Sequence, residues 1–347
     1  YDGNSVASLD ASSVAYSGLV SGDTFNGTFI GAFSDKNVGV GKTVTITPSY
    51  SGADVSNYSI TNHADVTANI TARSLTVSGV TASNKTYDST VTATMDSSSA
   101  VYSGFVNGDD FAGSYSGVFA NANVANGKTV TITSSYSGAD VSNYNITDQT
   151  STTANISAKA LTATASASSK VYDGSSASTV ILSLSGFIGS ETVTSTNSST
   201  FNNKNVGTGK IVTVNSITLA DGTNGGLASN YSISTGQTTT ANVTAKALTV
   251  SGITASNKVY DSSTNATTTL SFSGLIGSET INNTNSSTFD NKNIGTDKTV
   301  TVNSITLVDG SNGGLASNYS ISSGQTTTAN VSARPLTVSN ISASNKS

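Results

Sequence analysis

The stretch Lys42-Thr43-Val44-Thr45-Ile46-Thr47 alternates apolar residues with threonine. It recurs at 128–133 and, as Lys298-Thr299-Val300-Thr301-Val302, at 298–302. Period-two alternation of β-branched residues predicts a strand that buries one face and leaves the other in water. The residues that we expect to point inward are Val44, Ile46, Val130, Ile132, Val300 and Val302.

This strand belongs to a repeat that runs along the whole chain. A Tyr-Asp pair stands at positions 1, 87, 172 and 260, at steps of 86, 85 and 88 residues. A period of that length suits one module with its own core, and so predicts four modules. The predicted boundaries are 1–73 (module one, opening strand missing), 74–159 (module two), 160–246 (module three), 247–334 (module four) and 335–347 (opening strand of a next module).

Each module reads as a series of short strands. Leu-Thr-Val segments at 75–77, 248–250 and 336–338, with Leu161-Thr162-Ala163 as a variant, mark the opening strand. No segment shows a sustained helical period, and Gly, Asn and Ser punctuate the apolar stretches. Six to eight short strands per module predict an all-β, Ig-like β-sandwich, with a β-grasp module as the alternative.

The connections between modules are short. Residues 241–250 pass from the last strand of one module into the first of the next without a Gly/Ser spacer. A connection with few free dihedrals is expected to be stiff, so the array is expected to form an elongated rod.

The amino-acid composition argues against several classes of function. Charged residues are 10% of the chain and the net charge is −5, which argues against a nucleic-acid partner. There is no cysteine, and no apolar run is long enough to cross a membrane. His63 is the one histidine and has no counterpart in the other copies. We therefore expect no enzyme, no cofactor, and no catalytic, cofactor-binding or metal-binding residue.

Recurring polar residues have competing interpretations. The Tyr-Asp pair suits a sugar contact, but one copy per module at a junction favours a packed Tyr beside a turn-capping Asp. A second acidic series could hold Ca²⁺ or cap turns, and the absence of an Asp-x-Asp-x-Asp pattern favours capping. It consists of Asp23, Asp109, Glu191 and Glu279.

Two covalent modifications are also conceivable, and neither is favoured. An isopeptide bond could join Lys85, Lys170 or Lys258 to the Asn found in every module, but it requires a buried carboxylate nearby. Asn-x-Ser/Thr glycosylation motifs recur in a chain so rich in Ser and Thr that chance explains most of them. The module-end copies are Asn69, Asn155, Asn242 and Asn330.

Several of these motifs together resemble the YDG-type repeats of large bacterial surface adhesins similar to filamentous haemagglutinin. They are Lys-Val-Tyr-Asp-Gly (170–174), Phe-x-x-Lys-Asn-Val-Gly (201–207), the Asn-Tyr pair and Ala-Lys-Ala-Leu-Thr-Val (245–250). The second and fourth copies carry Ser89 and Ser262 in place of the glycine. The resemblance implies export to the cell surface and adhesion or matrix roles, and it carries over no catalytic residue.

We therefore expect a structural stalk or fibre segment of an extracellular surface protein. The expected partners are neighbouring modules or copies arranged head to tail, and possible further ones are glycans or a host or matrix surface. In the alternative, adhesive binding modules, the Gly/Asn-rich loops 221–227 and 309–315 make the contact. For the strand at 336–338 we expect pairing within a longer chain, with strand exchange between copies as the alternative.

Overall fold

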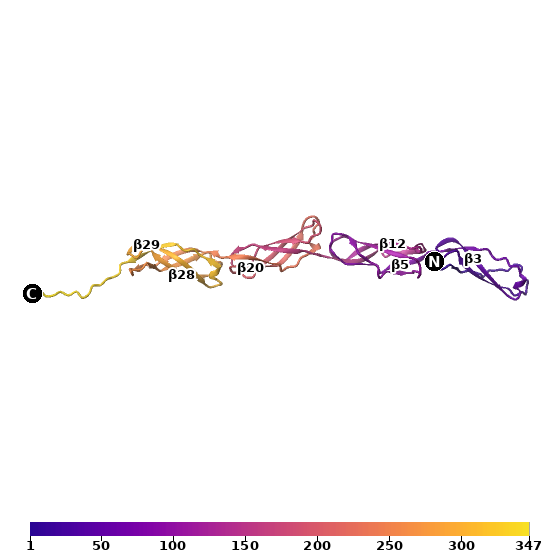
Figure 1. The fold of residues 1–347 in the computed structure, drawn as a ribbon, viewed down its shortest axis with the longest axis horizontal. Coiled ribbons are helices and arrows are strands. Elements are labelled where there is room, and N and C mark those ends of the chain that lie inside the picture. Colours follow the sequence, from indigo (N-terminus) through magenta and orange to yellow (C-terminus); the bar gives the residue numbers. More distant parts are fainter. Residues whose placement is uncertain (347) are drawn as a thin grey trace. The chain divides into compact units, whose positions relative to one another are not determined.

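The computed structural model describes residues 1–346, and in that range the protein is all-β (Figure 1). The helices of this range are four 3₁₀ turns of three residues each, so the α-helix of a β-grasp module is absent from it. Nothing in the described range is a helix long and apolar enough to span a membrane. The chain divides into two compact units, Tyr1–Lys159 with Ser229–Tyr231, and Ala160–Ala228 with the residues from Ser232 onward.

Unit 1 contains modules one and two. The elements of module one are β1 (Val6–Ala7), β2 (Asn26–Phe33), β3 (Gly39–Ser51), η1 (Val55–Asn57) and β4 (Val66–Ile70). Those of module two are β5 (Arg73–Ser78), β6 (Thr81–Ala82), β7 (Lys85–Thr86), β8 (Thr92–Ala93), β9 (Met95–Asp96), β10 (Val101–Ser103), β11 (Ala112–Phe119), β12 (Ala125–Ser137), η2 (Val141–Asn143), β13 (Tyr144–Thr147) and β14 (Ser151–Ser157).

Module two is a sandwich of two main sheets. One has the order β10-β5-β13 and the other β7-β14-β12-β11-β8, while β6 and β9 pair separately. Val77 of β5 and Val80 pack against Ile132 of β12, so the core lies between the sheets. These are ten strands where six to eight were expected, because β6, β7, β8 and β9 are pairings of only two residues each.

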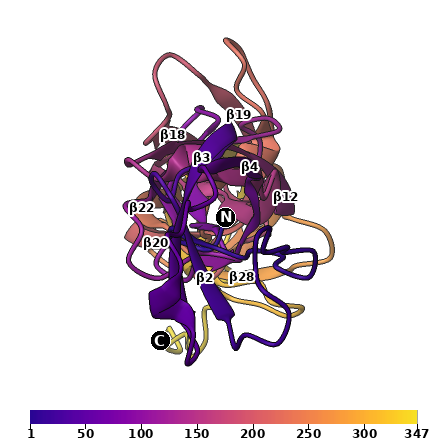
Figure 2. The ribbon, with the colours of Figure 1, turned by 90° about the vertical axis from the view of Figure 1, so that its right-hand side faces the viewer.

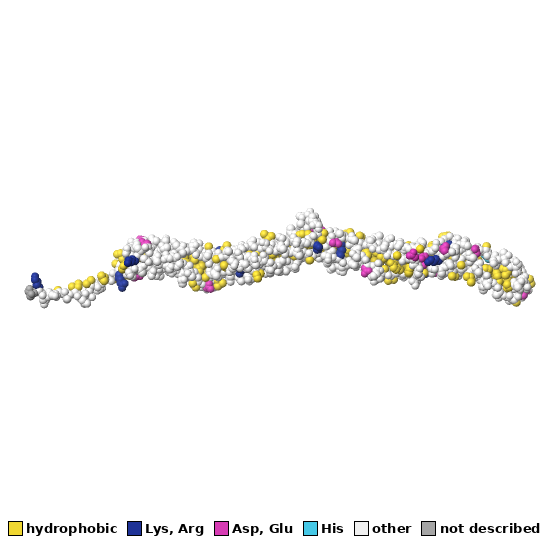
Figure 3. Space-filling model, viewed as in Figure 1, with side chains coloured by type: hydrophobic (Ala, Val, Ile, Leu, Met, Phe, Trp, Pro, Cys, Tyr) yellow, Lys and Arg dark blue, Asp and Glu magenta, His cyan; other side chains and the backbone are white. Residues whose placement is uncertain are grey.

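The two-faced pattern of the central strand is confirmed. Val44, Val130, Val300 and Val302 are at most 1% exposed, and the threonines beside them lie on the exposed or half-exposed face. Charged side chains are sparse on the face drawn in Figure 3, as the composition requires.

Module one differs from module two in one respect. Its strands form a single sheet in the order β1-β2-β3-β4, and the segments that match β10 and β13 are not strands. Figure 2 labels β2, β3 and β4 of this module, drawn in indigo and purple. In module two these strands pair only with β5, and module one holds no such strand. Ile46 is therefore only half-buried, and a groove of about 880 Å³ opens beside it.

Unit 2 contains modules three and four, apart from residues 229–231 of module three, which belong to unit 1. The elements from β15 to β22 are β15 (Lys159–Ala160), β16 (Thr162–Ala167), β17 (Lys170–Val171), β18 (Val180–Ser185), β19 (Val193–Phe201), β20 (Gly207–Asp221), η3 (Ala228–Asn230), β21 (Tyr231–Ser232) and β22 (Thr238–Thr244). Those of module four are β23 (Lys246–Ala247), β24 (Thr249–Ala255), β25 (Lys258–Val259), β26 (Asn265–Ala266), β27 (Thr268–Ser273), β28 (Ile281–Phe289), β29 (Gly295–Asp309), η4 (Ala316–Asn318), β30 (Tyr319–Ser320) and β31 (Thr326–Ser332).

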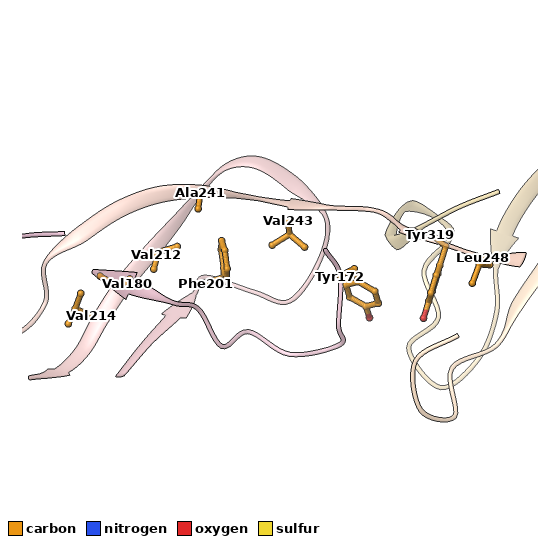
Figure 4. Packing of buried hydrophobic residues seen from close by; sticks show 9 residues of the cluster. All are labelled: Tyr172, Val180, Phe201, Val212, Val214, Ala241, Val243, Leu248 and Tyr319. Atoms are coloured by element: carbon orange, nitrogen blue, oxygen red, sulfur yellow. The ribbon is translucent and has the colours of Figure 1, made fainter. Parts of the chain in front are cut away.

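The topology of module two recurs in unit 2. Sheets β17-β22-β20-β19 and β25-β31-β29-β28-β26 form one layer of modules three and four, and β16-β18 and β24-β27 belong to the other. The core of module three continues without a break to Leu248 and Tyr319 of module four (Figure 4).

The predicted opening strand at 335–347 is not a strand over its described residues, and Ser347 lies outside them. Leu336 is 89% exposed. A strand is held by hydrogen bonds to neighbouring strands, and none lies beside this segment in the described part of the chain.

Candidate functional site: the joints between modules

Each Tyr-Asp-Gly motif forms a turn that presents its tyrosine at the end of a module. In module three Asp173 Oδ1 accepts hydrogen bonds from the Ser175 N–H (2.9 Å) and from Lys170 Nζ (2.8 Å). The same ammonium group donates to the carbonyl oxygens of Ser175 and Ala177, so its donors are all used. The structural interpretation of the pair is confirmed: Asp caps the turn, and Tyr172 is 1% exposed.

The tyrosine meets a carboxylate from the next module. Tyr172 Oη donates to Glu279 Oε1 (2.7 Å), and Tyr319 Oη donates to Glu279 Oε2 (2.7 Å). Lys204 Nζ lies 2.9 Å from Oε1 and forms an ion pair with it. Two modules are thus joined through one carboxylate that is 7% exposed and bonds two hydroxyls and one cation.

Burial and hydrogen bonding act in opposite directions on these groups. Burial by itself would raise the pKa of Glu279, but hydrogen bonds from Tyr319, Lys204 and Tyr172 outweigh it and lower the pKa below its ordinary value. Burial, followed by the hydrogen bond to Glu279, raises the pKa of Tyr319 to about 12. At neutral pH the joint therefore contains an ionised glutamate hydrogen-bonded to neutral tyrosines.

A pair of asparagines forms the second part of the joint. Asn318 Nδ2 donates to Asn205 Oδ1 (3.1 Å), and Asn318 Oδ1 accepts the backbone N–H of Val206 (2.9 Å). Asn318 is fully buried. Its amide therefore satisfies two polar groups of the preceding module, which would otherwise be desolvated without a partner.

The glycine of the motif forms the third part. Gly174 has a φ of +79°, and a Cβ built on it would lie 2.6 Å from Ile276 Cγ2 of module four. A side chain is excluded here both by the backbone conformation and by the neighbouring module.

The joint between modules one and two, inside unit 1, repeats this arrangement. Tyr1 Oη donates to Asp109 (2.8 Å), Tyr144 Oη donates to the same carboxylate (2.6 Å), and Lys36 lies 2.9 Å from it. Lys36 also pairs with Asp140, at 2.9 Å.

The remaining contacts of this joint match as well. Asn143 bonds Asn37 Oδ1 (3.1 Å) and the Val38 N–H (2.9 Å), and a Cβ on Gly3 would lie 2.6 Å from Val106 Cγ1. Two joints with different acids, Asp109 and Glu279, therefore share the same set of tyrosine, lysine, asparagine and glycine contacts.

Four consecutive stretches of the chain match one family, described as the YDG domain: residues 1–68, 71–153, 157–241 and 244–329. The chain belongs to the YDG domain family. The suspected YDG-type repeats are thus confirmed in all four copies, while the boundaries at 73/74, 159/160, 246/247 and 334/335 stay predictions. None of the curated proteins matches the sequence.

In these YDG modules the second acidic series does not serve mainly as turn caps, contrary to the favoured interpretation. Asp109 and Glu279 accept tyrosine hydroxyls and a lysine across the joint, and Asp23 accepts the Tyr58 hydroxyl at 2.6 Å. Local spacing cannot show this, because the donors lie 35 or more residues away. Among residues 1–346 no three His, Cys, Asp or Glu side chains form a group that could hold a metal ion.

The structure also places the residues considered for modification. Lys85, Lys170 and Lys258 each bond the Asp of their own Tyr-Asp pair at 2.7–2.8 Å. Asn37 and Asn205, by contrast, bond the asparagine of the next module. The motif asparagines at the module ends accept a backbone N–H through Oδ1; these are Asn69, Asn155, Asn242 and Asn330.

The Gly-to-Ser exchanges leave the turn intact. Ser89 and Ser262 have φ values of 62° and 66°, in the same left-handed region as Gly3 and Gly174. His63 is exposed and bonds only the neighbouring Ala64 carbonyl, at 2.6 Å.

Proposed function

We propose that this chain is a structural repeat segment, a stalk or fibre part of an extracellular bacterial surface adhesin or filament, in which the YDG modules act as stiff spacers. The neighbouring modules are themselves the partners that the recurring motifs recognise.

One observation carries this proposal: the residues that define the repeat converge on the joint. Tyr172, Lys204 and Asn205 of one module meet Glu279 and Asn318 of the next. Side chains held by several short hydrogen bonds and shielded from water resist reorientation, so a joint of this kind within a unit limits rotation of one module against the other. A spacer requires that property, whereas a flexible tether does not.

The alternative, adhesive modules that bind glycans or proteins through their Gly/Asn-rich loops, has less support. In the loop 221–227, Asp221 accepts the Ala228 N–H (2.7 Å), Thr223 bonds Thr192, and Asn224 donates to the Ser190 carbonyl (2.9 Å). The loop 309–315 makes the same bonds in module four. Although residues 221–225 are exposed, these polar groups already have hydrogen-bond partners within their own module.

Spin labels across one joint test the proposal. The chain has no cysteine, so labels attach only where cysteines are introduced. Suitable exposed positions are Thr240→Cys in module three and Thr306→Cys in module four. We expect a narrow distance distribution between the two labels. Glu279→Gln should broaden it, and Asp297→Asn, which removes an exposed charge of module four, should not. A distribution in the unmodified joint as broad as that of a flexible linker would overturn the stiff-spacer function.

A further inference from the structure

The opening segment and the last strand of a sandwich module lie side by side and run in the same direction. In module three, β17 pairs in parallel with β22: Lys170 lies beside Val243, and Val171 beside Thr244. Figure 4 shows Val243 of β22 close to Tyr172, the residue that follows β17. Modules two and four repeat this pairing, with β7 beside β14 and β25 beside β31. The segment that enters a module is therefore hydrogen-bonded to the strand that leaves it.

The parallel direction decides how the pair responds to a pull along the chain. Tension on the N-terminal side draws β17 back toward Leu161, and tension on the C-terminal side draws β22 forward beyond Thr244. Because the strands are parallel, these two forces slide one strand along the other and load the hydrogen bonds between them together. In an antiparallel pair the same two forces would act at one end and break the bonds one after another. Sliding requires several bonds to break at once, so it resists a higher force.

The pair is only two residues long, and further hydrogen bonds reinforce it. In module three the Tyr172 N–H donates to the Thr244 carbonyl (2.9 Å), and Thr244 Oγ1 donates to the Lys170 carbonyl (3.3 Å). Ser169 Oγ accepts the N–H of Asn242 (3.0 Å). Side chains from both strands thus add bonds across the same short contact.

These side-chain bonds recur in modules two and four. Asn84 Oδ1 accepts the Asn155 N–H, and Asn257 Oδ1 accepts the Asn330 N–H, each at 2.7 Å. A serine hydroxyl near the end of the last strand donates to the carbonyl of the motif lysine, at 3.3 Å in module two and 3.4 Å in module four. Three modules therefore keep the same bonds with different side chains.

The lysine of the Tyr-Asp motif anchors the opening segment to the rest of its module. Lys170 Nζ donates to the carbonyl oxygens of Ser175 (2.9 Å) and Ala177 (2.8 Å), and it lies 5.6 Å from the centre of the Phe201 ring. Phe201 belongs to β19 and is 3% exposed. A force on β17 therefore acts on the core of the module as well as on the pair with β22.

We propose that the parallel contact of residues 169–172 with 242–244, here called the terminal clamp, and its copies in modules two and four hold the modules folded under tension. This inference rests on the proposed stalk function, because a stalk transmits tension along its chain. The terminal clamp lies within one module, whereas the stiff joint lies between two. Spin-label distances test the joint and unfolding forces test the clamp, so either can fail without the other.

Single-molecule stretching of the full chain in two directions tests the terminal clamp. Handles at the two chain ends load it along the strands, and each sandwich module that unfolds should release roughly 25–30 nm of chain. Handles at Val171→Cys and Asn202→Cys, both exposed, instead pull across the sheet β17-β22-β20-β19 of module three. The natural chain has no thiol, so these handles attach only there. We expect a severalfold lower force across the sheet, and equal forces in the two directions would overturn the proposal.

Substitutions in the clamp of module three provide the second test. Ser169→Ala with Thr244→Val removes both side-chain bonds across the pair. Ser168→Ala with Thr240→Val is the matched control, because it makes the same exchanges at exposed positions outside the clamp. Pulled from its ends, the first variant should show one unfolding event shifted to lower force, and the control should show none. Ser169→Asn, which installs the residue of modules two and four, should keep the natural force.

The two pulling directions separate the clamp from a general loss of stability. Forced unfolding follows the rate of unfolding, which depends on the bonds that the force loads. Loss of the clamp bonds should lower the force along the chain by a larger fraction than the force across the sheet. An unchanged force along the chain, or an equal fractional loss in both directions, would show that the clamp does not bear the load.

Discussion

The hydroxyl groups of Tyr172 and Tyr319 bond opposite oxygens of the same carboxylate, each at 2.7 Å, although one tyrosine belongs to module three and the other to module four. Their rings meet edge to face, with centroids 5.5 Å apart. Glu279 is thus the common acceptor of two modules, and the motif that names the family contributes a donor to it. The Tyr-Asp-Gly turn therefore forms one side of the contact between two modules.

Replacing Glu279 by glutamine should open that joint. The substitution keeps the shape but removes the charge that Lys204 and the two hydroxyls share, and hydrogen bonds to a charged group contribute about 1.5–3 kcal/mol each. We expect a loss of about 2 kcal/mol in joint stability, which corresponds to about thirtyfold faster opening.

Amide hydrogen exchange at Val206 measures this opening directly, because its N–H bonds Asn318 of the next module. Asp297→Asn is the matched control, since it removes an exposed charge from the same module. Unchanged protection of Val206 in Glu279→Gln would mean that the carboxylate does not hold the modules together.

Acid should weaken the same joint. The pKa of Glu279 is lowered in the folded state, so its contribution is complete above the ordinary value of 4.5 and is lost as the pH falls through the lowered folded value. The distribution of spin-label distances between Thr240→Cys and Thr306→Cys should therefore broaden as the pH falls below 4.5. If Glu279→Gln broadens over the same pH range to the same extent, another group controls the transition.

High pH should also weaken this joint, through the titration of Tyr319. The pKa of Tyr319 is raised to about 12, so its neutral form is favoured by folding. That contribution is complete below the ordinary value of 10 and is lost as the pH rises through the folded value. Absorbance at the tyrosinate band should show a group titrating near 12, and in Glu279→Gln its pKa should fall but stay above the ordinary value, because burial still raises it. No change in that titration would contradict the hydrogen bond.

Gly174→Ala separates backbone conformation from the contact across the joint. Its φ of +79° alone makes an L-residue unfavourable by about 1–2 kcal/mol, and the new Cβ would also strike Ile276. Gly225, with a φ of +86° and no atom within 4 Å of a built Cβ, is the matched control for the backbone effect. We expect Gly174→Ala to speed amide exchange at Val206 and Gly225→Ala to leave it unchanged. Equal effects of the two substitutions would rule out a role for the contact with Ile276.

The sequence was sufficient to predict that each module is built from strands with one buried and one exposed face. Alternation in 42–47 and its copies predicted both the strand and its buried face, because side-chain direction in a strand depends on position alone. The recurrence of Tyr-Asp likewise predicted four modules and a structural role at the junction.

The joint itself could not be predicted in the same way. Tyr172 and Glu279 are 107 residues apart, and their meeting depends on how two folded modules dock. A single sequence shows that an acid recurs five residues after a glycine, but not what it faces. A usable signal was that tyrosine, asparagine and an acid each recur once per module, with the lysine in three of the four, which is expected of residues that serve a contact made once per module.

A substitution in the central strand of module two tests whether the alternating motif marks one buried and one exposed face. Val130 is fully buried in β12, and Thr131 beside it is exposed. Val130→Asp would bury an unpaired carboxylate, so we expect it to destabilise the module by several kcal/mol, on the order of 3 or more. Thr131→Asp keeps its charge in water and should change stability by less than about 0.5 kcal/mol. Amide exchange of β11, β12 and β14, followed strand by strand, locates the effect in module two, and module four serves as an internal reference in the same chain. If Thr131→Asp lowered protection as much as Val130→Asp, the alternation would not mark a buried face.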